Sequence, residues 1–214
     1  MSERTEHGIE AVLCDLDGVL RVWDSEATAE LERRYGVPEG TLLATAFTPE
    51  LLQPALTGAV TDDEYRRNIA VALLPEYGID VVADLVADWS QSFGSVDRDV
   101  RALLAQVRAS GVRVAIVSNA TTRLEADLAA LGVTEEVDVV VNSARLGVAK
   151  PEPTFYFAAA KLADAEVERC LFVDDTKVHV DVAKAVGMHG FQYTDAAGLR
   201  AELERLGVVE RSVP

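Results

Sequence analysis

Short apolar runs alternate with amphipathic segments over most of the chain, a pattern that predicts buried strands joined by helices. The first run, Ile9 and residues 11–13, leads into residues 14–18, which read CDLDG. A continuous apolar run is typical of a central strand in a parallel sheet, covered on both faces, and Gly18 indicates that the strand ends there. We therefore expect Asp15 at the carboxyl end of a buried strand, where open α/β sheets carry their chemistry.

Residues 22–93 have a different character, because apolar positions recur at helical spacing and no segment is convincing as a strand. Helices are expected over 25–35, 49–56, 65–74 and 80–92. Residues 61–64, TDDE, resemble a capping box, and their acidic side chains suit the N-terminus of a helix. The segment is interpreted as a small antiparallel helical bundle inserted into an α/β core of residues 1–21 and 94–214.

From residue 96 onward, expected strands alternate with expected helices, which is the signature of a parallel α/β sheet. The strands are expected over 112–117, 137–141, 170–173 and 190–193, and the helices over 99–109, 121–131, 154–163, 178–186 and 197–206. The predicted fold class is therefore α/β, a doubly wound, Rossmann-like parallel sheet with an inserted α-helical bundle.

Reactive polar side chains stand at the ends of three expected strands: Asp15 with Asp17, Ser118 with Asn119, and Asp174 with Asp175. Lys150 follows a fourth strand after one loop. Because the carboxyl ends of parallel strands lie along one edge of a sheet, these residues are expected to converge. Several carboxylates around one point make an all-oxygen site suited to Mg²⁺. Lys150, the Ser118 hydroxyl and nearby backbone N–H groups could hold phosphate oxygens.

Residues 15–18 have a simpler interpretation as well, since Asp and Gly are common in ordinary polar turns that follow strands. Two neighbouring buried carboxylates are costly unless a cation or hydrogen bonds compensate them. The convergence of four separate segments, rather than any one of them, favours a functional site.

Composition and charge restrict the class of protein and its partners. Of 214 residues, 49% are hydrophobic and 26% charged, which is typical of a globular domain, and residues 1–8 are expected to be a loose terminus. The formal net charge of −16 opposes binding to nucleic acid. No apolar run is long enough to span a membrane and the N-terminus has no apolar signal region, so a cytoplasmic location is expected. Cys14 and Cys170 are expected to be buried thiols.

Four segments together resemble the motifs of the haloacid dehalogenase-type hydrolases, a superfamily of aspartate-nucleophile phosphatases with an inserted cap. They are residues 14–20 (CDLDGVL), 117–120 (VSNA), 150–153 (KPEP) and 172–175 (FVDD). The resemblance covers essentially the whole core. It implies that residues 22–93 are a helical cap domain that closes over the site and selects the substrate.

The same resemblance implies roles for the first motif. Asp15 would attack phosphorus to form an aspartyl-phosphate, and Asp17 would protonate the leaving oxygen and then activate water. Asp15, the backbone carbonyl of Asp17 and Asp175 would hold Mg²⁺, with Asp174 acting directly or through water.

Roles for the other motifs follow in the same way. Ser118, the backbone of Asn119 and Lys150 would bind the transferring phosphoryl group. The resemblance thus implies a Mg²⁺-dependent phosphatase acting on a small phosphorylated metabolite. Asp17 favours phosphate chemistry over dehalogenation, since a halide leaves without a proton. A phosphomutase and a non-catalytic binding protein of the same fold remain open, as does a monomer or a homodimer.

Some residues outside the motifs are weaker candidates. The cap residues considered for contact with substrate are Trp23, Phe47, Gln53, Tyr65 and Arg66, although each is more easily explained by packing or solvation. His179 stands where the family more usually has asparagine, which leaves its contacts open. Lys177 is expected to be solvated.

Overall fold

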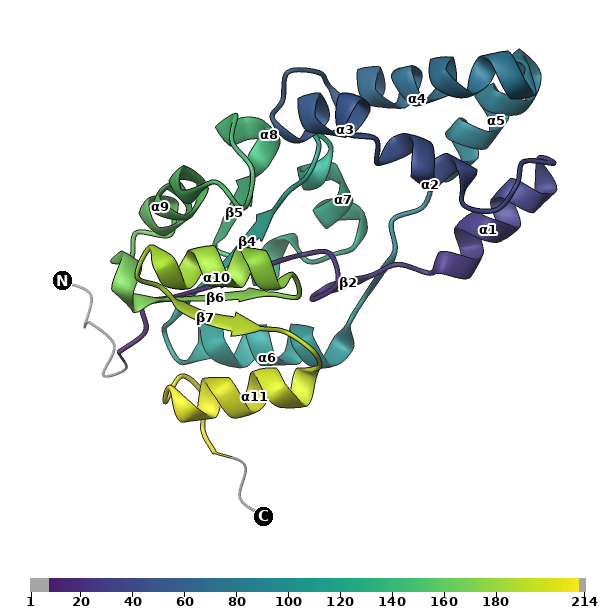
Figure 1. The fold of residues 1–214 in the computed structure, drawn as a ribbon. Helices are drawn as coiled ribbons and strands as arrows, with labels where there is room; N and C mark the ends of the chain where they lie inside the picture. The colour runs from purple at the N-terminus through teal and green to yellow at the C-terminus, as the bar shows by residue number, and fades with distance from the viewer. Residues whose placement is uncertain (1–7, 212–214) are drawn as a thin grey trace.

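The computed structural model describes residues 8–211 of the chain (Figure 1). Residues 1–7, most of the terminus expected to be loose, lie outside the described residues. The centre of the fold is a five-stranded parallel sheet with strand order β5-β4-β1-β6-β7. Its strands are β1 (Ala11–Cys14), β4 (Arg113–Ser118), β5 (Val139–Asn142), β6 (Cys170–Asp174) and β7 (His189–Gln192).

Alternate residues of β1 belong to two separate apolar clusters, one on each face of the sheet. Val12 and Cys14 pack with α6 (Arg98–Ala109), α7 (Leu124–Ala130) and α11 (Ala196–Arg205). Ala11 and Leu13 pack with α9 (Pro153–Leu162) and α10 (Lys177–Ala185). Every residue of β1 is buried, as a central parallel strand requires. The predicted doubly wound fold is confirmed.

A third apolar cluster belongs to the helices α1 (Ser25–Arg34), α2 (Thr41–Ala46), α3 (Pro49–Leu56), α4 (Asp62–Tyr77) and α5 (Ile79–Trp89). We call these five helices the helical cluster. They gather at one end of the molecule in Figure 1, with α3 beside the short α8 (Ser143–Leu146). Thr61 and Glu64 form the expected capping box, which begins α4 at Asp62.

The chain leaves the sheet for the helical cluster, and returns, through a two-stranded antiparallel ribbon of β2 (Arg21–Val22) and β3 (Ser95–Val96). Neither the ribbon nor α2 was expected from the sequence. Strands of two residues are too short to show an alternating pattern, and α2 is less than two helical turns long between Gly40 and Phe47. The short α8, which follows β5 directly, was not expected either.

Several helices differ by a few residues from their expected bounds. The helix expected over 121–131 begins only at Leu124, because Thr121 is held in the preceding loop by Asp62 and Asn142. Two short 3₁₀ segments, Thr134–Glu136 and Val167–Arg169, precede β5 and β6. Cys14 and Cys170 are buried free thiols, as predicted. Within residues 8–211, no helix has both the length and the apolar character that crossing a bilayer requires.

Candidate active site

A cavity of about 320 Å³ opens where β1, β4 and β6 end at the carboxyl edge of the sheet. The three strands end together because Cys14 of β1 lies opposite Ile116 of β4 and Val173 of β6. The cavity is lined by Asp15, Asp17, Gly18, Ser118, Asn119, Lys150, Asp175, Thr176 and His179. The structure therefore brings together six of the seven site residues expected from the sequence. The seventh, Asp174, is fully buried and contacts three of the residues that line the cavity, Lys150, Thr176 and His179.

Lys150 is the buried cation at the base of the cavity. Its Nζ lies 2.9 Å from Oδ1 of Asp15 and 2.7 Å from Oδ2 of Asp174, and donates to the Val117 carbonyl at 3.2 Å. Asn119 holds the Lys150 backbone from both sides, since its Oδ1 accepts from the Lys150 N–H and its Nδ2 donates to the Lys150 carbonyl, each at 2.8 Å. The ammonium is thereby fixed between two carboxylates of different strands.

Both carboxylate oxygens of Asp174 contact protein groups. Besides Lys150, the backbone N–H of Thr176 lies 2.8 Å from Oδ1, and Nδ1 of His179 lies 3.1 Å from both oxygens. Burial alone would raise the pKa of Asp174, but the hydrogen bond with His179 and the Lys150 ammonium lower that pKa to about 2. Asp174 is thus an ionised anchor for Lys150 and His179.

The carboxyl group of Asp15 is more exposed than that of Asp174 and has fewer hydrogen-bond partners. Within residues 8–211, its two contacts, from Lys150 at 2.9 Å and from the Leu16 N–H at 2.8 Å, both fall on Oδ1. Burial raises the pKa of Asp15 to about 7, although the Lys150 ammonium opposes this shift. Oδ2 of Asp15 accepts no hydrogen bond from the described residues.

The donor set fits a divalent cation. Asp15, Asp174 and Asp175 each offer a carboxylate oxygen, and these oxygens lie within 4.8 Å of one another. Three carboxylates and one ammonium leave an excess of negative charge, which a hard divalent cation with oxygen ligands would balance. The backbone at Gly18 has a φ of +79°, which favours glycine, and a Cβ there would lie 2.2 Å from Oδ2 of Asp175, so a larger residue would displace this carboxylate.

The Asp17 carboxylate is bound by one donor residue in the ribbon, Arg21, and one directly after strand β2, Trp23. Arg21 binds this carboxylate through two nitrogens, Nε to Oδ1 at 2.7 Å and a terminal nitrogen to Oδ2 at 2.9 Å. The indole Nε1 of Trp23 donates to Oδ1 at 2.5 Å. Sequence reasoning did not identify Arg21, because only the turn after Gly18 brings residue 21 back beside residue 17.

Of the five cap candidates, only Trp23 contacts an expected site residue within the described part of the chain. The Tyr65 hydroxyl donates to the Ala46 carbonyl inside the helical cluster, and Arg66 pairs with Asp62. Phe47 and Gln53 are exposed and do not line the cavity. His179 does line it and binds Asp174, whereas Lys177 is an exposed partner of Asp181, as expected.

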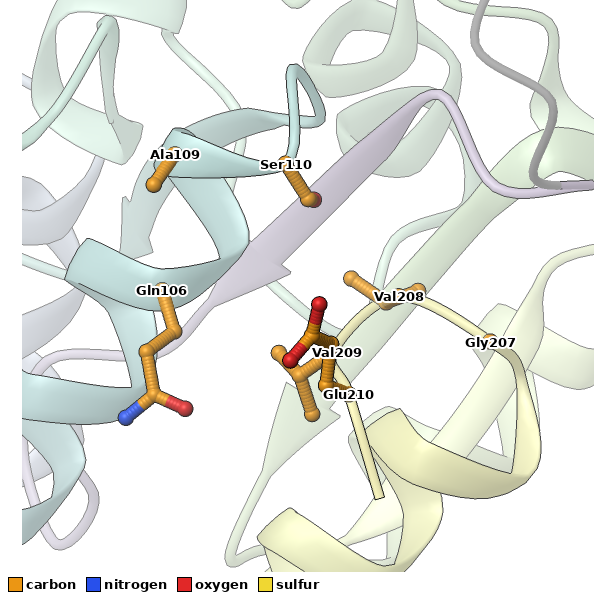
Figure 2. Close-up of a pocket in the computed structure, with 7 residues that line it drawn as sticks. All are labelled: Gln106, Ala109, Ser110, Gly207, Val208, Val209 and Glu210. Carbon is orange, nitrogen blue, oxygen red and sulfur yellow. The ribbon is translucent and has the colours of Figure 1, made fainter. Parts of the chain in front are cut away.

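A second hollow, of about 530 Å³, lies between the end of α6 and the segment that follows α11 (Figure 2). Gln106, Ser110, Val209 and Glu210 are among its lining residues. Ser110 precedes β4, so this hollow lies at the amino-terminal edge of the sheet, opposite Asp15. Its lining contains one carboxylate and no basic side chain, so it lacks the groups that make the first cavity a candidate active site.

Comparisons with known proteins add relatives that share most of their length with this chain. A family model described as haloacid dehalogenase-like hydrolase matches residues 9–187. Phosphatase MT3486 of Mycobacterium tuberculosis is 28% identical over 94% of this chain and 96% of its own. A phosphoglycolate phosphatase of Cupriavidus necator is 29% identical over 83% of this chain and 78% of its own.

Among solved structures, a haloacid dehalogenase family enzyme of Bacteroides thetaiotaomicron in complex with magnesium and inorganic phosphate has a similar fold. The TM-score is 0.71 at 20% sequence identity, with 87% of this chain and 94% of that chain covered. At this identity the likeness bears on the fold, and it agrees with the parallel sheet and flanking helices described above.

Proposed function

Because this chain belongs to the haloacid dehalogenase-like hydrolases, we propose that it is a Mg²⁺-dependent phosphatase that cleaves a small phosphate monoester. The observation that carries the proposal is the buried Lys150 ammonium fixed between Asp15 and Asp174 at the floor of the cavity. This arrangement brings together a nucleophile, a cation that can bind phosphate and a group of carboxylates that can bind a metal ion. The phosphatase names of the relatives support this reaction class.

Asp15 is the proposed nucleophile. Its Oδ2, the oxygen without a protein donor in the described chain, attacks phosphorus and forms an aspartyl-phosphate while the bond to the leaving oxygen breaks. Lys150 and the Leu16 N–H hold Oδ1, so the attacking oxygen is oriented toward the cavity before substrate arrives. Water then attacks the aspartyl-phosphate, which releases inorganic phosphate and restores the carboxylate.

Asp17 is the proposed proton donor and acceptor. It gives a proton to the leaving oxygen in the first step and takes one from the attacking water in the second. Its side chain lines the same cavity as Asp15 and is 38% exposed, which gives it access to both oxygens. This proton transfer is the feature that suits an ester substrate rather than a halide.

Mg²⁺ is proposed to be held by Asp15, Asp175 and the backbone carbonyl of Asp17. Asp174 is proposed to act on it through water, because its own oxygens already bind Lys150, His179 and the Thr176 N–H. When bound, the cation supplies charge neutralisation for the phosphoryl oxygens among these carboxylates. Ser118, the Asn119 N–H and Lys150 are the proposed protein contacts of the phosphoryl group.

Residues 22–93 are proposed to be a cap domain, and residues 1–21 and 94–214 the core domain. The separate apolar core of the helical cluster and its two-stranded connection support this division. The cavity of about 320 Å³ is near the lower end of the ~300–1,000 Å³ range of ligand pockets, which favours a small ester. The proposed substrate class is therefore a small phosphorylated metabolite.

Hydrolysis of p-nitrophenyl phosphate by the wild type, by Asp15→Asn and by the surface control Lys177→Met tests the proposal. We expect phosphate release that needs Mg²⁺, stops with EDTA and is lost in Asp15→Asn but not in Lys177→Met. A panel of phosphorylated metabolites then separates a phosphatase, which frees phosphate, from a mutase, which moves it to another carbon. Absence of release from folded protein that binds Mg²⁺ would contradict the proposal.

A further inference from the structure

The Asp17 carboxylate accepts more hydrogen bonds from the protein than its place in the cavity wall requires. Three donors bind its two oxygens: Nε and a terminal nitrogen of Arg21, and the indole Nε1 of Trp23. A carboxylate has about four acceptor positions, two on each oxygen. Oδ1 accepts from both residues and Oδ2 accepts only from Arg21, so one position on Oδ2 remains.

We infer that Arg21 and Trp23 are positioning residues that hold the Asp17 carboxyl so that this remaining position on Oδ2 serves the leaving oxygen. The inference rests on the proposed function, in which Asp17 transfers the proton. A carboxyl group with free rotation would sample many orientations, whereas a bidentate guanidinium contact fixes the plane of the group. Trp23 donates to Oδ1 from a second direction. Because Oδ1 is then fully occupied, Oδ2 is the oxygen that can contact the leaving oxygen of the substrate.

The Arg21 guanidinium is also bound through the nitrogen that does not contact Asp17. The Arg21 side chain is 5% exposed, and its other terminal nitrogen donates to Asp127 at 3.2 Å. Asp127 also binds Arg123 at 2.8 Å, and the Arg21 guanidinium lies 4.5 Å from the centre of the Trp23 ring. Asp127 therefore restrains the Arg21 guanidinium through the terminal nitrogen that does not contact Asp17. The stacked indole keeps the two donors at a constant relative position.

Both donors stand at the ribbon that joins the sheet to the helical cluster. Arg21 pairs with Val96 across the ribbon, and the Leu20 carbonyl accepts from the Asp97 N–H at 2.8 Å. At Gly94 a Cβ would lie 2.8 Å from the Val22 carbonyl oxygen, so the two strands are packed closely next to Trp23. The position of the Asp17 carboxyl is thus set by the same segment that attaches the helical cluster.

The test compares p-nitrophenyl phosphate, whose leaving oxygen needs little protonation, with phenyl phosphate, whose leaving oxygen needs more. The variants are Trp23→Phe, which removes the indole donor and keeps a ring, and Arg21→Lys, which keeps the charge without the bidentate contact. Trp89→Phe is the matched control, because the Trp89 ring also stacks on an arginine, Arg66, and lies in the helical cluster. Asp17→Asn shows how much activity is lost when the proton donor itself is removed.

We expect Trp23→Phe and Arg21→Lys to lower kcat/KM for phenyl phosphate on the order of tenfold, the scale of one hydrogen bond to a charged group. The kcat/KM for p-nitrophenyl phosphate should change by less than about threefold, and Trp89→Phe should match the wild type. Because kcat/KM reports the steps up to formation of the aspartyl-phosphate, the later hydrolysis of this intermediate, which also uses Asp17, does not enter the comparison. An equal loss on both esters, or none, would overturn the positioning role. Trp23 is 46% exposed, so Trp23→Phe gives a folded variant even if Arg21→Lys does not.

A second measurement does not depend on turnover. The chain has two tryptophans, so the indole N–H resonance of Trp23 can be assigned by its loss in Trp23→Phe. We expect that resonance to move in Asp17→Asn, while the Trp89 resonance does not. An unmoved Trp23 resonance would contradict the contact itself. Failure of the wild type on both esters would instead overturn the proposed function and the inference with it.

Discussion

The Nζ of Lys150 lies 2.7 Å from Oδ2 of Asp174, and neither side chain is more than 1% exposed. The same ammonium lies 2.9 Å from Asp15, so one buried cation compensates two buried carboxylates, one directly after β1 and one at the end of β6. A buried charge that loses its partner is costly, because neither water nor another ion replaces it. The stability of the fold and the arrangement of the site therefore depend on the same contact.

Replacement of Lys150 by methionine should destabilise the protein strongly. Two buried carboxylates would remain without their cation, and breaking such a pair costs about 3–5 kcal/mol of unfolding free energy. Urea denaturation in EDTA measures the loss, and added Mg²⁺ should restore part of it. Lys177→Met is the matched control, since Lys177 is exposed and pairs with Asp181 on the surface. Equal stabilities of the two variants would mean that Lys150 does not compensate these carboxylates.

Substitution of Gly18 by alanine should weaken Mg²⁺ binding, because the new Cβ would lie 2.2 Å from Oδ2 of Asp175 and displace that carboxylate. A loss of affinity on the order of tenfold or more is expected, the scale of disturbing one ligand. Calorimetric titration with MgCl₂ provides the measurement.

Gly36→Ala is the control that separates the loss of Mg²⁺ affinity in Gly18→Ala from the effect of backbone strain. Gly36 has a φ of +70°, close to that of Gly18, but a Cβ there meets no atom within 4 Å. Both variants should lose about 1 kcal/mol of stability from the left-handed backbone, and only Gly18→Ala should lose Mg²⁺ affinity. Equal Mg²⁺ affinities would exclude Asp175 as a ligand in the proposed site.

Asp62 links the helical cluster to the sheet. Its backbone N–H donates to the Thr122 hydroxyl at 2.9 Å, and its Oδ1 accepts from the Thr121 hydroxyl at 2.7 Å. We expect Asp62→Ala to increase hydrogen exchange in residues 121–122, since the contact with Thr121 is lost, and at the start of α4, where the pair with Arg66 is lost as well. If the helical cluster is a cap, KM should rise as well.

The adjacent Asp63→Ala is the control for this prediction. Both aspartates lie in the first turn of α4 and interact similarly with the helix dipole, but Asp63 is exposed. The same exchange pattern in both variants would show that the effect comes from the helix end and not from contact with the sheet.

The regular elements could largely be predicted from the sequence because each carries local signals. Pro49 begins α3, the Thr61–Glu64 capping box begins α4, and buried apolar runs identify β1 and β6. The convergence of the site residues also follows from the sequence, since three strands with polar ends must meet at one edge of a parallel sheet. These signals depend on a few neighbouring residues or on topology alone.

Other features depend on geometry that no local pattern encodes. The contact of Arg21 with Asp17 needs the turn at Gly18, and that of His179 with Asp174 needs α10 to begin directly after Thr176. The two-residue strands of the ribbon are stabilised by each other and not by their own sequence. Tyr65 was a candidate for contact with substrate, but its side chain is packed inside the helical cluster, which the sequence alone did not reveal.

The central claim is that Asp15 carries the phosphoryl group during turnover. The most direct measurement is acid quenching of the enzyme with Mg²⁺ and p-nitrophenyl phosphate, followed by mass spectrometry of the peptide that contains residue 15. Asp17→Asn should accumulate the intermediate, because the water that hydrolyses it loses its base, and Asp15→Asn should show none. One phosphoryl group on Asp15 is the predicted result. Phosphate release by the wild type with no phosphorylated peptide in any variant would contradict the mechanism.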